Sequence, residues 1–162
     1  MKVLKVNSMI RSNKEYIKLL IWIDDLLDSP SLACIDTEEN KIEEIVSNII
    51  KDTNTKCKVL DFGIGTDNKP NYLLGALNNF KLENPGIIPI IINLDKKLDL
   101  FNRGLQDLAY TINMNRELLI FYTCTPVIMV CTHETMNALN LYAHDFVTTI
   151  DFRWSVNYNE NK

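Results

Sequence analysis

Residues 89–100 read PIIINLDKKLDL, and this apolar run gives the clearest indication of the fold class. Its apolar residues follow one another without alternating with polar ones, which predicts a strand, placed at 87–94, that is covered on both faces. Strands of this kind belong to parallel sheets with helices on either side. Four other short runs, rich in Ile, Val and Leu, have the same character: 31–35, 57–62, 126–132 and 146–154.

Segments with helical periodicity separate these strands. In one of them apolar residues recur every three or four positions, as at Ile42, Ile45 and Ile49, and Thr37 or Asn40 is expected to cap the helix. Strands that alternate with helices indicate βαβ crossovers, so we expect an α/β fold, a three-layer sandwich with a mainly parallel central sheet. The expected helical segments are 13–27, 40–52, 71–80 and 100–122.

Length and charge limit the domain count and the partners. A chain of 162 residues fits one domain, expected at 1–156, with a polar tail at 157–162. The 17 lysines and arginines are scattered, the net charge is −4 and the pI is about 5.2, so we expect no nucleic-acid partner. No stretch reaches the roughly 18 uncharged apolar residues of a membrane span, and no signal peptide is recognisable. We therefore expect a cytoplasmic protein, or the cytosolic part of a membrane-associated machine without membrane insertion of its own.

The four cysteines are expected to be reduced residues in or near the core. Three lie in apolar runs and one directly precedes such a run, and buried thiols behave as small hydrophobes. There is no CxxC pair, and the two histidines are too isolated in the sequence to complete a zinc site, so we expect neither a metal nor a cofactor. The residues concerned are Cys34, Cys57, Cys124, Cys131, His133 and His144.

The turn after the first strand, DTEENK at 36–41, does not suit a phosphate. A phosphate-binding loop needs glycines, so that successive backbone N–H groups can converge on the anion. This turn has no glycine and one lysine, Lys41, and its three acids, Asp36, Glu38 and Glu39, would repel a triphosphate. The glycines of GIGTDNKP, at 63–70, are expected to serve an ordinary turn.

Two later strand ends carry groups of chemical interest. Asp95 follows the strand at 87–94 and could hold a metal ion through water, but Lys96 stands where a motor ATPase needs the glutamate that activates water. His133 follows the strand at 126–132, where a γ-phosphate sensor would lie. A half-exposed structural histidine is the simpler interpretation.

The second half of the chain resembles the FtsK/SpoIIIE-type branch of RecA-like motor ATPases. INLDKKLDL matches the Walker B strand of that family, with Asp95 and Asp99 kept and Lys96 in place of glutamate. In VCTHET, Thr132 is kept and His133 replaces glutamine. DFVTTIDFRW, at 145–154, matches the family's last strand, with Thr149 in place of an arginine.

Within that branch, LDFG at 60–63 resembles the ATPase domains of EssC/YukB-type coupling proteins of type VII secretion, in particular the third and last of them. In this alignment Lys41 falls on the phosphate-loop lysine and Ile42 on the Ser/Thr that follows. A competing alignment places Lys14 on the lysine and Glu15 on the Ser/Thr. The resemblance implies a P-loop NTPase fold of the RecA-like type without a functional P-loop.

The resemblance also implies a function, that of a catalytically inactive domain, or pseudo-ATPase, that acts by protein–protein interaction. Its partner would be a secretion substrate or an adjacent motor ATPase domain, and its role substrate recognition or regulation. The exposed faces of the helices at 13–28 and 101–122, with Trp22 and Trp154, are provisional contact surfaces, although both tryptophans are expected to lie in the core. Two alternatives remain: a small metal-dependent α/β enzyme that uses Asp95, Asp99 and His133, and a phage or mobile-element protein that binds and inhibits a motor ATPase.

Overall fold

Five parallel strands form the central sheet in a computed structural model that describes residues 10, 13–25, 30–61, 73–86, 88–94, 103–121 and 124–157. The order of the strands is β2-β3-β4-β1-β5, and every neighbouring pair is parallel. The expected α/β architecture with a parallel sheet is therefore confirmed. The strands are β1 Ser31–Thr37, β2 Lys58–Asp61, β3 Ile90–Asn93, β4 Pro126–Thr132 and β5 Phe152–Ser155.

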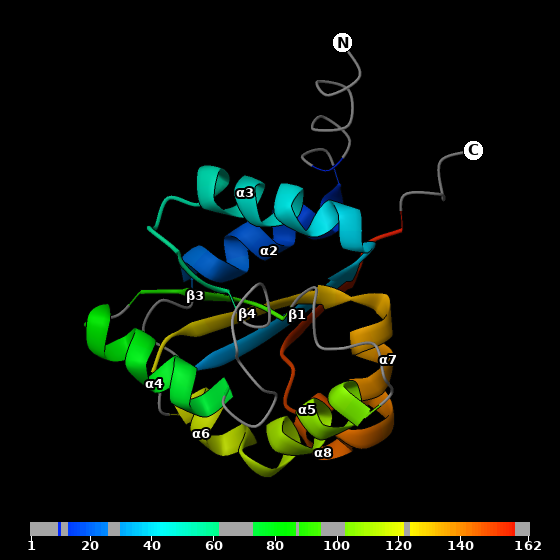
Figure 1. Ribbon diagram of the computed structural model, residues 1–162. Helices are drawn as coiled ribbons and strands as arrows, with labels where there is room; N and C mark the ends of the chain where they lie inside the picture. The colour runs from blue at the N-terminus through cyan, green and yellow to red at the C-terminus, as the bar shows by residue number, and fades with distance from the viewer. Residues whose placement is uncertain are drawn as a thin grey trace.

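Helices cover both faces of the sheet (Figure 1). Helices α2 and α3 lie on one face, and α4 to α8 lie on the other. None of the helices within the described ranges is long and apolar enough to cross a membrane. The helices are α2 Lys14–Asp25, α3 Ile42–Asp52, α4 Leu73–Glu83, α5 Arg103–Met114, α6 Arg116–Phe121, α7 His133–Tyr142 and α8 His144–Val147, and a 3-10 turn, Glu39–Lys41, precedes α3.

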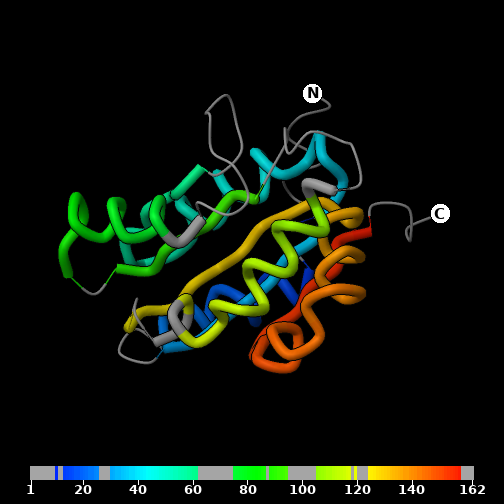
Figure 2. The backbone as a smooth tube through the Cα atoms, turned by 60° about the horizontal axis from the view of Figure 1, so that its bottom comes forward, coloured from blue at the N-terminus to red at the C-terminus, as the bar shows by residue number. Residues whose placement is uncertain are grey.

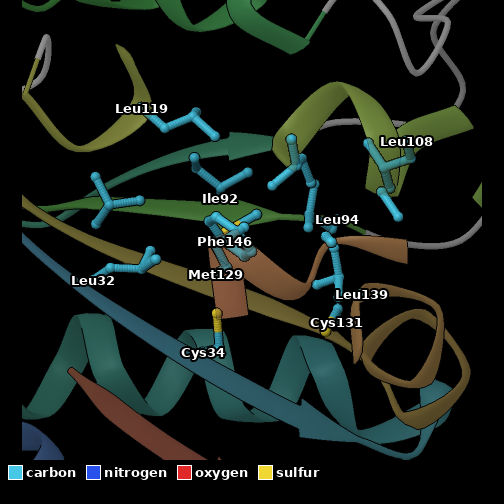
Figure 3. Packing of buried hydrophobic residues seen from close by; sticks show 14 of the residues in the cluster. Leu32, Cys34, Ile92, Leu94, Leu108, Leu119, Met129, Cys131, Leu139 and Phe146 are labelled. Carbon is cyan, nitrogen blue, oxygen red and sulfur yellow. The ribbon is translucent and has the colours of Figure 1, made fainter. Parts of the chain in front are cut away.

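Alternate side chains of each inner strand enter two separate cores. On β1, Leu32 and Cys34 pack toward α4 to α8, whereas Ala33 and Ile35 pack toward α2 and α3. Figure 3 shows the first of these cores, which contains Phe146 from α8 and Met129 from β4. All seven residues of β1 are buried, which explains why its sequence lacks polar alternation.

The segment 146–154 is not the continuous strand that the sequence predicted. Its first residues belong to α8, where the backbone N–H of Phe146 donates to Asn113 Oδ1 at 2.9 Å, and the Phe146 side chain is fully buried. The hydroxyls of Thr148 and Thr149 then donate to carbonyl oxygens three residues earlier, and only afterwards does β5 begin. The prediction was wrong because these local and tertiary bonds override the β propensity of the threonines.

Two further helices differ from the prediction. The single helix expected at 100–122 is interrupted at Asn115, whose side-chain amide donates to the carbonyl of Thr111 at 2.9 Å and so competes with the regular backbone pattern. The second is α7, which the sequence interpretation did not anticipate because its apolar residues are spread around the helix and not confined to one face: Met136 and Leu139 are buried, whereas Leu141 is exposed.

Three of the four cysteines are buried, and Cys124 is exposed. The expectation that all four lie in or near the core was thus wrong for Cys124, because the buried part of β4 begins only at Pro126. None of the four, all of which lie within the described ranges, forms a disulfide. Burial raises the pKa of the Cys34 thiol to about 12, with a smaller upward effect from Asp36, and burial also raises the pKa of Cys57.

The two tryptophans differ in their surroundings. Trp154 on β5 is buried, as expected, and its ring lies 5.9 Å from that of Tyr16. Trp22 on α2 is only half-buried, and its ring lies 6.3 Å from that of Phe152. Both therefore tie α2 to the edge strand β5, and neither is a freely exposed contact residue.

The buried strand β3 should tolerate no charge. Ile91→Asp should lower the free energy of unfolding by several kcal/mol, because an unpaired carboxylate would enter the core between the sheet and α3. Ile17→Asp is the matched control, since Ile17 is 45% exposed on α2 and its replacement should change stability by about 0.5 kcal/mol or less. Urea denaturation of both variants, followed by circular dichroism, measures the difference; equal effects would contradict the assignment of β3 to the core.

Thiol alkylation should distinguish the cysteines. At pH 9, iodoacetamide should modify Cys124 rapidly and Cys34 hardly at all. Cys34 is inaccessible, and its raised pKa keeps its thiol protonated at this pH. Peptide mass spectrometry after timed alkylation gives the rate at each position. In denaturant all four should react at similar rates, and fast native modification of Cys34 would contradict the structure.

Candidate functional site

The position of a ligand site in this sheet follows from its topology. From β1 the chain continues into α3 on one face, and from the neighbouring strand β4 it continues into α7 on the other face. Connections that leave adjacent strands toward opposite faces open a crevice beyond the carboxyl ends of those strands, where open α/β sheets bind ligands. The candidate site is therefore the edge formed by the ends of β1 and β4, where Thr37 and Thr132 are paired in register.

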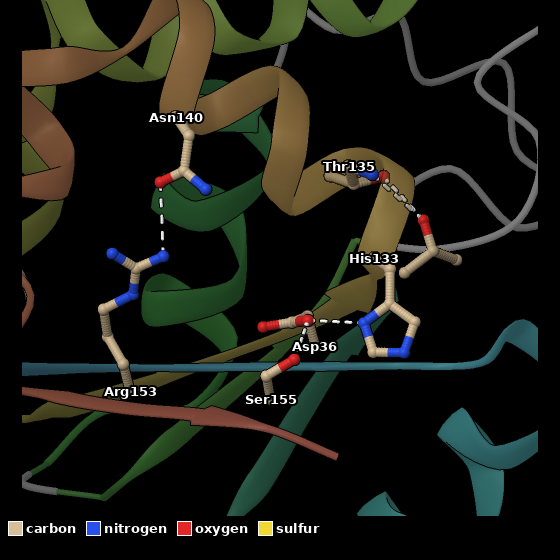
Figure 4. A network of polar contacts seen from close by, with 7 residues as sticks. Asp36, His133, Thr135, Asn140, Arg153 and Ser155 are labelled. Atoms are coloured by element: carbon tan, nitrogen blue, oxygen red, sulfur yellow. Dashed lines mark hydrogen bonds and ion pairs between the residues drawn. The ribbon is translucent and has the colours of Figure 1, made fainter. Parts of the chain in front are cut away.

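A buried carboxylate, Asp36, lies at this edge and is bonded to two other elements (Figure 4). The hydroxyl of Ser155 donates to Asp36 Oδ2 at 2.7 Å, and Nδ1 of His133 lies 2.5 Å from the same oxygen. The Asp36 side chain is 10% exposed, so these bonds replace much of the water that it loses on folding. One side chain thus joins the ends of β1 and β5 to the start of α7.

This arrangement is not a nucleophilic triad. In such a triad the serine hydroxyl contacts the histidine, which takes its proton, and the acid orients the histidine from the other side. Here Ser155 and His133 both contact Asp36 Oδ2, and the Ser155 proton is directed to the carboxylate. The three residues therefore serve to join structural elements. His133 was expected to be a half-exposed structural histidine, and its side chain is 37% exposed.

The threonine that the family resemblance retains has a structural role. Thr132 is the N-cap of α7, and its Oγ1 accepts a hydrogen bond from the backbone N–H of Thr135 at 3.1 Å. Because capping by threonine typically stabilises a helix by about 1 kcal/mol, this bond alone accounts for a threonine at the position.

The turn after β1 does not form an anion cradle. The backbone N–H of Lys41 already donates to the carbonyl of Glu38 at 2.9 Å, and the ammonium group of Lys41 lies 3.4 Å from Glu44. Two expectations about this turn were wrong. Asp36 belongs to β1 and not to the loop, and neither Thr37 nor Asn40 caps α3, because a 3-10 turn with no side-chain cap precedes the helix.

Uncharged polar groups also lie near this edge. Thr37 Oγ1 and Asn93 Oδ1 are buried and have no hydrogen-bond partner among the described residues, whereas Asn93 Nδ2 donates to Asp61 at 3.2 Å. Strand β4 lies between β1 and β3, so the hydroxyl and the amide oxygen are on strands that do not touch. A hydroxyl and an amide oxygen this far apart could each hold a water molecule, but they cannot surround a phosphate.

Only some of the remaining candidate residues lie within the described ranges. Asp95, Lys96 and Asp99 lie outside the described residues. Lys41 follows a strand and precedes a helix, as a phosphate-loop lysine does, whereas Lys14 is the first residue of α2. Thr149, aligned with an arginine of the family, lies in the turn after α8 and donates to the carbonyl of Phe146 at 2.6 Å.

Sequence interpretation missed Ser155 because it ended the last strand at residue 154. Polar residues at the carboxyl ends of parallel strands were the signal that could have identified it, once β5 was placed at Phe152–Ser155. Among the described residues, no group of three His, Cys, Asp or Glu side chains is arranged to hold a metal ion.

Comparison with protein-family models and with curated proteins identified no relative. The chemistry of the edge must therefore be interpreted from its own geometry.

The Asp36 network should contribute measurably to stability. Asp36→Ala should lower the free energy of unfolding by about 2 to 4 kcal/mol, since two hydrogen bonds to a buried charged group are lost, and Ser155→Ala should lower it by about 1 kcal/mol. In the double variant the two losses should not add, because the hydroxyl of Ser155 no longer has its acceptor once Asp36 is gone. Glu38→Ala, an exposed acid two residues away that makes no cap bond, is the control and should change stability by about 0.5 kcal/mol or less. Urea denaturation measures all four, and strictly additive losses would contradict the network.

Proposed function

We propose that this chain is a catalytically inactive FtsK/SpoIIIE-like domain that acts by binding another protein. The observation that carries the proposal is the bonding of Asp36 at the edge where β1 and β4 end: its Oδ2 is held by His133 and Ser155. A nucleotide site at that position would need groups that complement a phosphate. The end of β1 instead carries a carboxylate whose hydrogen bonds are made within the chain.

The order of the strands supports the relation to RecA-like motors. In the alignment with that family, β1 leads to the phosphate loop, β3 carries the Walker B motif and β4 carries the sensor. Strand β4 lies between the other two, so a sensor at its end would reach a γ-phosphate held over β1 and a metal ion at the end of β3. This arrangement is the one expected for a RecA-like domain.

Three differences from a working motor would remove nucleotide binding and hydrolysis while leaving the order of the strands unchanged. The turn after β1 has no glycine, and the amide of Lys41 is already bonded to Glu38. Asp36 places a negative side chain beside the position of a triphosphate. Lys96 cannot accept a proton at neutral pH and so cannot replace the glutamate of a working motor. Because all three losses concern nucleotide chemistry, we infer that the domain neither binds nor hydrolyses nucleotides.

A domain without nucleotide chemistry acts through its surface. The resemblance to the last ATPase domain of EssC/YukB-type proteins places this activity at a type VII secretion machine, on its cytoplasmic side. The partner would then be a secretion substrate or a neighbouring motor ATPase domain, and the role substrate recognition or regulation. The acidic charge of the chain disfavours nucleic acid as the partner.

Nucleotide titration tests the proposal directly. Isothermal titration calorimetry with ATP and Mg²⁺ should show no binding tighter than roughly 100 µM, about −5.5 kcal/mol, with an intact FtsK-type motor as positive control. Lys96→Glu, which restores the missing glutamate, should remain without ATPase activity, because the phosphate loop is missing as well. Turnover by that variant, or saturable binding of ATP to the natural chain, would contradict the proposal.

Calorimetry and an ATPase assay separate the alternatives. Tight binding of Mg²⁺ or Mn²⁺ alone would favour a metal-dependent enzyme that uses Asp95, Asp99 and His133. A fall in the ATPase rate of an unrelated intact hexameric motor, in proportion to the amount of this chain added, would favour an inhibitor. Neither effect is expected for a domain that recognises a secretion substrate or regulates only its own neighbouring motor domain.

A further inference from the structure

Four large apolar side chains are exposed together on α5 and α7. Their relative exposures are 48% for Tyr110, 80% for Met114, 74% for Leu141 and 36% for Tyr142. The rings of Tyr110 and Tyr142 lie 5.6 Å apart, and α5 (yellow-green) runs beside α7 (orange) in Figure 2. We call these four residues the α5–α7 patch.

The patch rests on a firmly joined pair of helices. The backbone N–H of Phe146, just beyond α7, donates to Asn113 Oδ1 at 2.9 Å, one residue before Met114. Met114 is one helical turn after Tyr110 and therefore lies on the same side of α5. Helices α5 and α7 each follow a strand of the parallel sheet on the same face and lead back toward the start of the next strand, so they run parallel to each other. Tyr110 and Tyr142 therefore contribute to one surface.

The charged side chains described on α5 to α8 are mostly negative. Asp107, Glu117 and Asp145 are exposed, and none of them forms an ion pair within the described part of the chain. Two arginines whose side chains are described lie at these helices: Arg116 is half-buried and donates to the carbonyl of Asn113 at 2.7 Å, and Arg153 of β5 donates to Asn140 of α7 at 3.2 Å. An apolar centre with an acidic rim complements an apolar surface with a basic rim.

The other exposed apolar stripe of the molecule has a different rim. Ile17 and Ile21 lie one turn apart on α2, and Lys14 and Lys18 flank them. Helix α2 covers the opposite face of the sheet. The combination of aromatic, methionine and acidic side chains is therefore a property of the α5–α7 patch and not of the exposed helices in general.

We infer that the α5–α7 patch binds an amphipathic helix of a partner protein whose apolar face is flanked by lysine or arginine. Two side-by-side helices present side chains at the spacing that a third helix can match. Met114 adapts to different apolar shapes, and the tyrosine rings attract cations through their faces. The inference rests on the proposed function, since it names the partner chemistry for a domain that acts by protein contact.

Titration with defined peptides tests the inference. An amphipathic peptide of leucine and lysine, about 18 residues long, is added to the ¹⁵N-labelled chain, and amide shifts are followed by NMR; its counterpart contains glutamate in place of lysine. The leucine–lysine peptide should bind saturably and shift the amides of α5 and α7. The leucine–glutamate peptide should bind at least about tenfold more weakly.

Matched variants locate the binding surface. Met114→Ser with Leu141→Ser should weaken binding of the leucine–lysine peptide by about tenfold, and Asp107→Asn with Asp145→Asn should weaken it and reduce its dependence on salt. Ile17→Ser with Ile21→Ser, which removes the same number of exposed apolar side chains from α2, should change affinity less than about twofold. All these positions are exposed, so the variants should fold.

Three results would overturn the inference. The first is equal binding of the two peptides, and the second is a set of amide shifts confined to α2 or to the ends of the strands. The third is broadening of the patch signals that grows with protein concentration in the absence of peptide, which would assign the patch to contact with a second copy of the chain. The outcome is independent of the nucleotide titration. ATP binding with intact peptide binding would overturn the proposed function alone, and loss of peptide binding without ATP binding would overturn only the patch.

Discussion

Burial of the sheet on both faces is the constraint on which the rest of the molecule depends. A strand such as β1, with no residue facing water, must have helices above and below it, and each parallel neighbour must be reached by a crossover. Two separate cores follow, one beneath α2 and α3 and one beneath α4 to α8. The same parallel arrangement collects the carboxyl ends of all five strands at one edge.

The proposed function rests on that edge. A carboxylate is costly to bury without donors, and Asp36 obtains them from two elements that are distant in sequence. The same bonds occupy Asp36 Oδ2 at the end of β1, where the proposed relatives hold a phosphate. One interaction thus meets a structural demand and carries the proposal that the domain does not bind nucleotides.

The same fold also presents an exposed apolar surface. The packing of α5 against α7 leaves Tyr110, Met114 and Tyr142 exposed, although residues on their other sides are deeply buried. Monomeric proteins seldom leave such side chains grouped without a use. The acidic side chains on these helices favour a positively charged partner. In the proposed function, the α5–α7 patch therefore provides the binding specificity, and the ends of the strands do not.

The sequence by itself determined the α/β class, the positions of β1 to β4 and the absence of a glycine-rich loop, because burial periodicity and glycine chemistry are local properties. Only the tertiary structure decided that Asp36 belongs to a strand, that Ser155 is its partner, that Phe146 enters the core from a helix, and that Tyr110 meets Tyr142. The physical reason is separation along the chain. Asp36 bonds to His133 and Ser155 across 97 and 119 positions, and no local pattern reports which strand ends will meet.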